Sequence, residues 1–173
     1  MKRHRILEVG PGITPMHHRS KGERDLQLGE DEEYTGLDQP HAVDRMSEHE
    51  VWKKANEQYG DRAHLIQGDR ADMSGIADES IDELVALGTH AREGKVVSEF
   101  RRVLAPGGLL RLGVPTNGLP ELMSTWGVRL QRLGFTELSD QQQEYNYSSR
   151  PDIPEATISY IVVTFQKGGK AVE

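Results

Sequence analysis

Two glycines and an acidic residue stand together near the beginning of the sequence, at the end of an apolar run. The stretch RILEVGPGITP, residues 5–15, places Glu8 inside the run and Gly10 and Gly12 directly after it. Glycine lets a backbone turn tightly and approach a ligand with no side chain between them. The pattern is typical of a strand that turns sharply into a helix beneath a bound cofactor.

The residues after this turn suit the start of a helix, but they do not identify the cofactor. Thr14 can cap the helix, and Pro15 can occupy its first position, where no backbone donor is needed. The dinucleotide fingerprint G-x-G-x-x-G requires a third glycine at position 15, where this chain has proline. Two glycines alone are also compatible with a plain tight turn.

Acidic residues also mark the ends of the next two predicted strands. Asp38 ends the run EYTGLD, and Asp69 follows Gly68 at the end of AHLIQGD. Ligands of open parallel sheets bind beyond the carboxyl ends of the strands, where a carboxylate can accept hydrogen bonds from ribose hydroxyls. Glu8 lies in an otherwise apolar strand, so its carboxyl group needs a polar partner or a ligand amine.

Short apolar runs alternate with helical patterns along the chain, which predicts a mostly parallel α/β sheet. The predicted strands cover residues 5–10, 33–38, 63–69, 81–88, 109–115, 135–139 and 156–167. No helical pattern separates the last two strands, so we expect them to pair as an antiparallel hairpin. The polar stretch between them, residues 140–155, is expected to be a long loop.

Helical patterns cover residues 47–60, 96–104 and 119–133. Ser47 and Glu50 have the spacing of a capping box at the start of the first helix. Gly60 and Gly134 are predicted to stop the first and third helices. The segment APGG is predicted to end the second.

Composition limits the class of protein. The chain has 173 residues and a net charge of -7, with 21 Lys plus Arg against 28 Asp plus Glu. We expect one domain over residues 1–173, with its core at about 5–167 and a frayed tail at 168–173. The acidic balance argues against autonomous nucleic-acid binding. The absence of cysteine excludes thiolate zinc sites and cysteine nucleophiles.

No apolar run approaches membrane-spanning length, and the N-terminus lacks the apolar region of a signal peptide. A cytoplasmic location, with no membrane binding, is therefore the expectation.

Taken in order, several stretches resemble the class I S-adenosylmethionine-dependent methyltransferases, especially the compact type known as methyltransferase domain 11. They are ILEVGPG, YTGLD, LIQGDRADM, ADESIDELVALG and EFRRVLAPGGLLRLGVP, of which RVLAPGG is the most specific. The resemblance covers most of residues 5–167. It implies a single Rossmann-like domain, a doubly wound, seven-stranded, mostly parallel sheet with a C-terminal antiparallel hairpin. Thr14 stands where such proteins commonly carry a third glycine, and we interpret this as a variant turn.

The resemblance also implies an activity and a set of cofactor contacts. It implies that the chain is an enzyme transferring a methyl group from S-adenosylmethionine to a small-molecule, peptide or carrier-bound acceptor, leaving S-adenosylhomocysteine. Glu8 would meet the methionine amino group, directly or through water. Gly10 and Gly12 would line the methionine and ribose. Asp38 would hold the ribose hydroxyls, with Gln39 beside the adenine.

Further along the chain, the resemblance places the adenine and the sulfonium. Gly68 and Asp69 would border the adenine, with Asp69 reaching its amino group and Arg70 packed nearby. Leu87 and Gly88 would form the floor under the sulfonium.

Histidine is the usual general base near neutral pH, and His90 stands two residues beyond the fourth predicted strand, where an acceptor would approach. A loop histidine that caps the next helix is the alternative reading of His90. The adjacent His17 and His18 have no acidic partners at ligand spacing, so no metal site is predicted.

Two other functions remain open. An NAD-dependent oxidoreductase would need the third glycine and a longer chain, and would give RVLAPGG no role. A catalytically silent methyltransferase-like subunit could instead bind or scaffold a partner. The chain shows no inserted lid, so we expect the site to be open, or completed by a second copy, a partner subunit or a loop that becomes ordered.

Overall fold

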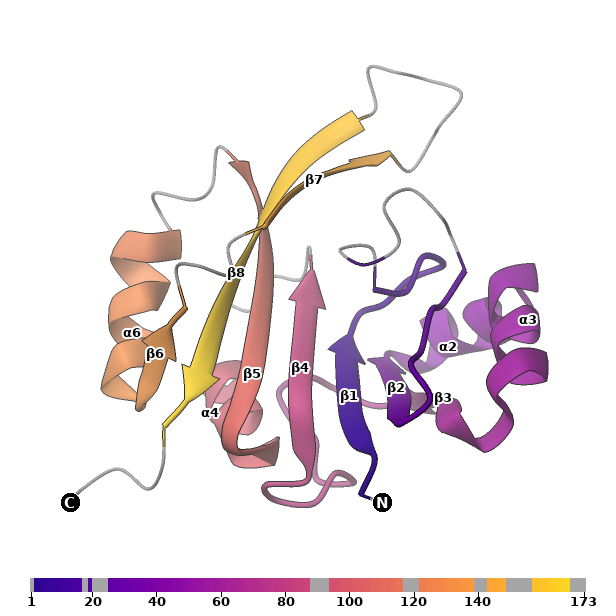
Figure 1. Cartoon of the computed structure of the whole chain (residues 1–173), viewed down its shortest axis with the longest axis horizontal. Helices are drawn as coiled ribbons and strands as arrows, with labels where there is room; N and C mark the ends of the chain where they lie inside the picture. The colour runs from indigo at the N-terminus through magenta and orange to yellow at the C-terminus, as the bar shows by residue number, and fades with distance from the viewer. Residues whose placement is uncertain are drawn as a thin grey trace.

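A sheet of eight strands with β1 near its middle organises the molecule (Figure 1). The strands are β1 (His4–Val9), β2 (Glu32–Asp38), β3 (Ala63–Gln67), β4 (Ile81–Leu87), β5 (Leu104–Pro115), β6 (Phe135–Glu137), β7 (Gln143–Ser148) and β8 (Thr157–Lys167). Their order across the sheet is β3-β2-β1-β4-β5-β8-β6, and β7 also pairs with β8. The first five strands in this order, from β3 to β5, pair with their neighbours in parallel. Strand β8 runs antiparallel to β5, β6 and β7.

This computed structural model describes residues 2–16, 19, 25–87, 94–116, 122–138, 143–148 and 157–168. For residues 122–124, 143, 145–148 and 157–158 it describes the backbone alone.

Strands β6 and β7 share one edge of β8. Thr136 of β6 and Leu109 of β5 both pair with Gln166, so they lie on opposite sides of β8. Tyr145 of β7 and Pro115 of β5 pair with Tyr160 in the same way. The sheet therefore has seven positions, which confirms the predicted Rossmann-like α/β fold and its antiparallel C-terminal strand. The difference is β7, which lies inside the predicted loop 140–155.

The helical segments are α2 (Pro40–Ser47), α3 (Glu50–Tyr59), η1 (Gly60–Arg62), α4 (Gly94–Val103), the π-helical η3 (Leu122–Gly127) and α6 (Val128–Arg132). The predicted capping box was wrong. Ser47 ends α2, and its hydroxyl donates to the Asp44 carbonyl at 2.9 Å. His49 caps α3 instead, its Nδ1 accepting from the Val51 N–H at 3.3 Å. The helix predicted over residues 47–60 therefore corresponds to α3, which begins at Glu50, and α2 is an additional helix that the sequence analysis did not predict.

The predicted ends of the first and third helices, at Gly60 and Gly134, are confirmed. Gly60 and Gly134 have φ values of +54° and +81°, a left-handed conformation that glycine adopts without strain. The APGG segment follows α4 as predicted, but it is already part of β5, which begins at Leu104.

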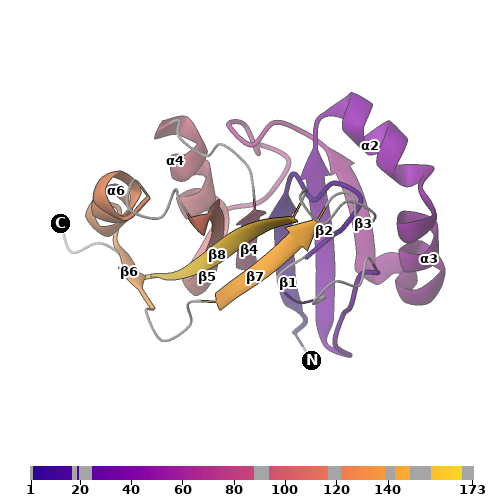
Figure 2. The same ribbon diagram turned by 90° about the horizontal axis from the view of Figure 1, so that it is seen from above.

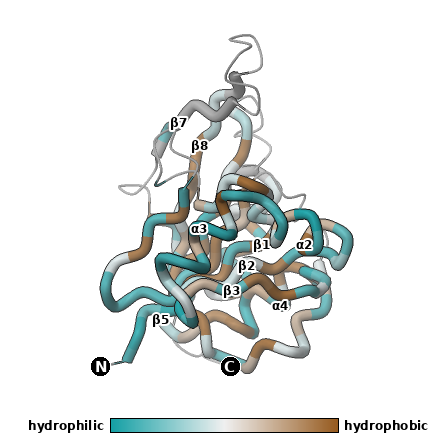
Figure 3. The backbone as a smooth tube through the Cα atoms, turned by 90° about the vertical axis from the view of Figure 1, so that its right-hand side faces the viewer, coloured by the Kyte–Doolittle hydropathy of each residue, from teal (hydrophilic) through white to brown (hydrophobic). Residues whose placement is uncertain are grey.

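Two apolar layers cover the sheet, one on each face. Leu7 and Val9 of β1 point into a cluster with the buried residues of α4 and α6. Ile6, on the alternate face, packs in a second cluster with residues of α2 and α3. Figure 2 shows α4 and α6 together on one side of the sheet, and Figure 3 shows hydrophobic stretches along the strands with hydrophilic ones around them. Within the described ranges, no helix has the length and apolar character needed to cross a bilayer.

Candidate functional site

The carboxyl ends of β1, β2, β3 and β4 lie at one edge of the sheet, the upper edge in Figure 1. The register pairs Val9 with Leu37 and Leu37 with Ile66, so β1, β2 and β3 end at the same level. The parallel topology thus places the glycine turn after β1 beside Asp38 at the end of β2.

The turn after β1 has the tight conformation that the sequence predicts, but the helix start predicted at Thr14 and Pro15 is wrong, because both residues belong to the turn and Met16 after them has a φ of +51°. Gly10 and Gly12 have φ values of +67° and +60°. The Gly10 N–H donates to the Leu37 carbonyl at 2.9 Å, which fixes the start of the turn to β2. A Cβ atom built on Gly12 would meet nothing within 4 Å, so Gly12 faces open space. The turn therefore offers bare backbone to a ligand.

A tryptophan of α3 holds the middle of this turn. The Trp52 indole Nε1–H donates to the Gly12 carbonyl at 3.1 Å. Pro11 is buried against β2, where a Cβ on Gly36 would lie 3.0 Å from the proline Cγ. Trp52 is a buried residue of α3, and nothing in the sequence indicates this hydrogen bond.

Glu8 lies beneath the turn, with only 1% of its surface exposed. Its Oε2 accepts hydrogen bonds from the Met16 N–H at 2.7 Å and the Tyr34 hydroxyl at 2.6 Å. Oε1 receives no hydrogen bond from the described residues. Burial raises the pKa of Glu8 to about 7, although both hydrogen bonds act in the opposite direction.

Asp38 connects the ends of β2 and β3. Its Oδ1 accepts from the backbone N–H of Gln39 at 2.8 Å, and its carbonyl accepts from the Gly68 N–H at 2.9 Å. The Asp38 side chain is half-buried at the sheet edge, and Gln39 is exposed beside it at the start of α2. The structure thus brings three of the residues selected from the sequence together.

Of the other residues selected from the sequence, the structure describes three, Asp69, Arg70 and Leu87. Asp69 is exposed, and its Oδ1 accepts from the Ala71 N–H at 2.8 Å, while Arg70 is half-buried. Leu87 is buried at the end of β4. Gly88 and His90, like His17 and His18, lie outside the residues that the structure describes.

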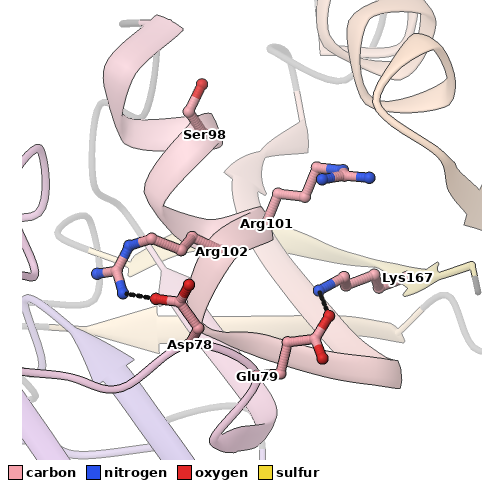
Figure 4. A pocket seen from close by; sticks show the side chains of 6 residues that line it. All are labelled: Asp78, Glu79, Ser98, Arg101, Arg102 and Lys167. Carbon is pink, nitrogen blue, oxygen red and sulfur yellow. Dashed lines mark hydrogen bonds and ion pairs between the residues drawn. The ribbon is translucent and has the colours of Figure 1, made fainter. Parts of the chain in front are cut away.

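A pocket of about 340 Å³ lies away from this edge, beside the loop that precedes β4 (Figure 4). It is lined by Asp78, Glu79, Ser98, Arg101, Arg102 and Lys167. Arg102 Nη1 pairs with Asp78 at 2.6 Å and Lys167 Nζ pairs with Glu79 at 3.4 Å, while Lys167 Nζ also donates a hydrogen bond to the Leu104 carbonyl at 2.5 Å. These ion pairs tie α4 and β8 to the loop, so we assign this pocket a structural role.

Comparison with protein-family models and with curated proteins finds no match. Solved structures do match. CrArsM, an arsenic(III) S-adenosylmethionine methyltransferase from Chlamydomonas reinhardtii, has a TM-score of 0.60 at 21% identity, covering 99% of this chain and 66% of its own. A chain from the complex between the Haloferax volcanii Trm112 methyltransferase activator and a candidate methyltransferase has a TM-score of 0.63 at 12% identity, covering 100% and 86%.

The [4+2]-cyclase SpnF also matches, with a TM-score of 0.60 at 16% identity, covering 96% of this chain and 76% of its own. Identities this low establish the fold and leave the reaction open. The strand order, the antiparallel β8 and these neighbours together confirm the resemblance at the level of the fold. The molecule has the fold of the class I S-adenosylmethionine-dependent methyltransferases.

Proposed function

We propose that this protein is an enzyme that transfers a methyl group from S-adenosylmethionine to a small-molecule, peptide or carrier-bound acceptor. The observation that carries the proposal is the juxtaposition at one sheet edge of an open glycine turn, a buried carboxyl group and Asp38, in a methyltransferase fold.

The turn and Glu8 fit the methionine end of the cofactor. Gly12 faces open space, so backbone can lie close to a ligand, and Gly10 lines the same turn. Glu8 is a buried carboxyl group with one oxygen that no described residue donates to, and its pKa is raised to about 7. A ligand ammonium near Glu8, directly or through water, would favour the ionised form and lower that pKa.

The ends of β2 and β3 fit the nucleoside. Asp38 Oδ1 is engaged by the Gln39 N–H, and its second oxygen is the group we assign to the ribose hydroxyls. We assign the adenine side to Gln39, Gly68 and Asp69, with Arg70 packed nearby.

The end of β4 is assigned to the reacting centre. Leu87 and Gly88 would form the floor beneath the sulfonium, which supplies an electrophilic methyl group when the cofactor is bound. His90 would take the proton that an amine or hydroxyl acceptor loses. The chain's other contribution is to hold the acceptor in line with the methyl group and to exclude water.

A methyltransferase-like subunit without methyl-transfer activity is the second candidate. It is favoured by one structural neighbour, SpnF, which shares the fold and is described as a [4+2]-cyclase; the neighbour from a complex with a methyltransferase activator bears on a partner subunit instead. A second copy of the chain or a partner subunit that completes an open site agrees with the same observation. We place the protein in the cytoplasm. NAD is disfavoured because Pro15 stands in place of the third glycine.

Calorimetric titration with S-adenosylmethionine, S-adenosylhomocysteine and NAD tests the proposal. We expect micromolar binding of the first two ligands and none of NAD. Asp38→Ala should weaken S-adenosylhomocysteine binding at least tenfold, because the ribose loses its carboxylate acceptor. Asp61→Ala is the matched control, since Asp61 is 85% exposed in the turn before β3 and should leave binding unchanged. Absence of binding by both methyl cofactors, or binding of NAD, would contradict the proposal.

A further inference from the structure

We propose that Trp52 is a positioning residue for the cofactor, and that its indole N–H holds the glycine turn in its ligand-accepting shape. This inference rests on the proposed function, because it concerns the same site. The turn lacks the usual third glycine, with Thr14 and Pro15 in the positions that follow Ile13. Contacts from outside the turn contribute to its shape.

Among the described residues, hydrogen bonds from different parts of the molecule hold the beginning, middle and end of the turn. The Gly10 N–H is bound to the β2 carbonyl of Leu37, and the Met16 N–H is bound to Glu8. The middle is bound by Trp52, at the Gly12 carbonyl. Of these, the Trp52 contact is the one from a side chain outside the sheet.

The indole is itself held in place by a buried aromatic neighbour. The Trp52 and Tyr34 rings lie 5.9 Å apart at an angle of 37°, and the Tyr34 hydroxyl donates to Glu8 at 2.6 Å. Trp52 and Tyr34 are 5% and 0% exposed. Trp52, Tyr34 and Glu8 therefore form one connected unit that links α3 to both the middle and the far end of the turn.

The tryptophan contact matters because Gly12 is conformationally free. Gly12 has a φ of +60° and no neighbouring atoms on its open side, so the turn itself offers little resistance to a change of this residue's conformation. Glycine populates other backbone regions about as readily. The hydrogen bond to the Gly12 carbonyl fixes the orientation of the Gly12–Ile13 peptide plane. A turn that is already held in the bound conformation loses less conformational entropy when the ligand binds.

The test compares two tryptophan variants of the full chain. Trp52→Phe keeps an aromatic ring beside Tyr34 and removes the N–H donor. Trp126→Phe is the matched control, because the chain has two tryptophans and Trp126 is buried in the other apolar layer. We expect Trp52→Phe to weaken S-adenosylhomocysteine binding in calorimetry about tenfold, the effect of losing one hydrogen bond. Trp126→Phe should change binding less than twofold at a temperature where both variants are folded.

Nuclear magnetic resonance gives a readout that general destabilisation would not produce. The Trp126→Phe variant has a single indole N–H signal, that of Trp52. We expect this proton to exchange slowly with solvent and its signal to shift when S-adenosylhomocysteine is added. This measurement decides the inference even if Trp52→Phe does not fold.

The outcomes separate the two proposals. If the wild-type protein binds S-adenosylhomocysteine and both variants bind it equally, or lose affinity equally, the role of Trp52 is overturned and the proposed function stands. If the Trp52 indole proton exchanges rapidly with solvent and its signal does not shift when S-adenosylhomocysteine is added, that role is overturned as well. If the wild-type protein binds neither methyl cofactor, the proposed function fails, and the positioning role fails with it.

Discussion

The carboxyl group of Glu8 is buried in the folded protein and exposed to water in the unfolded chain, so folding raises its pKa. Its pKa is raised from 4.5 to about 7, mainly by burial. Between these values the folded chain holds a proton that the unfolded chain releases, so this group's contribution to stability is complete below pH 4.5 and is lost as the pH rises to 7. Over that window the loss amounts to about 3 kcal/mol.

Glu8→Gln should remove this pH dependence, because the amide keeps the shape of the side chain and does not ionise. We expect the free energy of unfolding of the wild-type protein to fall, relative to Glu8→Gln, by about 2–3 kcal/mol between pH 5 and pH 8. Urea unfolding of both proteins at several pH values measures the difference. Titration of His4 beside Glu83, which raises the pKa of that histidine, is common to both proteins and cancels. Parallel pH curves would contradict this account of Glu8.

At the residue scale, the sequence predicts where the site residues lie better than it predicts their hydrogen-bond partners. The glycine turn, Glu8 and Asp38 could be predicted because each follows from where an apolar strand ends. The partners could not be, since the Trp52 donor lies 40 residues from Gly12 and the Tyr34 donor lies 26 residues from Glu8. A helical apolar pattern indicates that Trp52 is buried, but not where its N–H points.

At the element scale, β2 makes room for the turn through a glycine. A Cβ on Gly36 would lie 2.9 Å from Leu65 Cδ2 and 3.0 Å from Pro11 Cγ. Gly36→Ala should therefore push Pro11 outward, lower the free energy of unfolding by about 1–3 kcal/mol and weaken S-adenosylhomocysteine binding. Gly75→Ala is the control, because a Cβ there meets nothing within 4 Å. Urea unfolding and calorimetry measure the two effects, and equal behaviour of the two variants would refute the steric argument.

The run RVLAPGG, the most specific part of the resemblance, begins with an arginine that has a structural role. Arg102, in the run RVLAPGG, donates to the carbonyls of Met73 and Ile76 and pairs with Asp78 and Glu99. Its pKa is raised, first by the hydrogen bond with Glu99. One side chain thus fixes the loop before β4 against α4.

The elements that the sequence analysis missed are those with weak patterns. Helix α2 has two buried residues, Val43 and Met46, too few for a clear helical period. Its last residue, Ser47, has the type and spacing of a cap for the next helix. Strand β7 has tyrosines at alternate positions, 145 and 147, but polar neighbours hide this period. Its pairing with β8 supplies what the local pattern does not.

At the scale of the whole molecule, a cofactor that binds the folded chain alone must stabilise it. With S-adenosylhomocysteine at a hundred times its Kd, we expect the free energy of unfolding to rise by about 2.7 kcal/mol. For a chain of 173 residues this corresponds to a rise in Tm of roughly 5–10 °C. Differential scanning fluorimetry with and without ligand measures the shift, with NAD at equal concentration as the control. The same shift with NAD, or none with S-adenosylhomocysteine, would count against the assigned site.

The antiparallel strand β8 also sets the order in which the sheet can be completed on the ribosome. β8 lies between β5 and the pair of strands β6 and β7, yet it follows all of them along the chain. While residues 116–156 are being synthesised, the outer edge of β5 has no strand to pair with. β8 pairs with Leu109–Pro115 of β5, and an open edge of these seven residues is a template for pairing with other chains. The nascent protein is thus most exposed to aggregation late in translation, when most of its core has already been made.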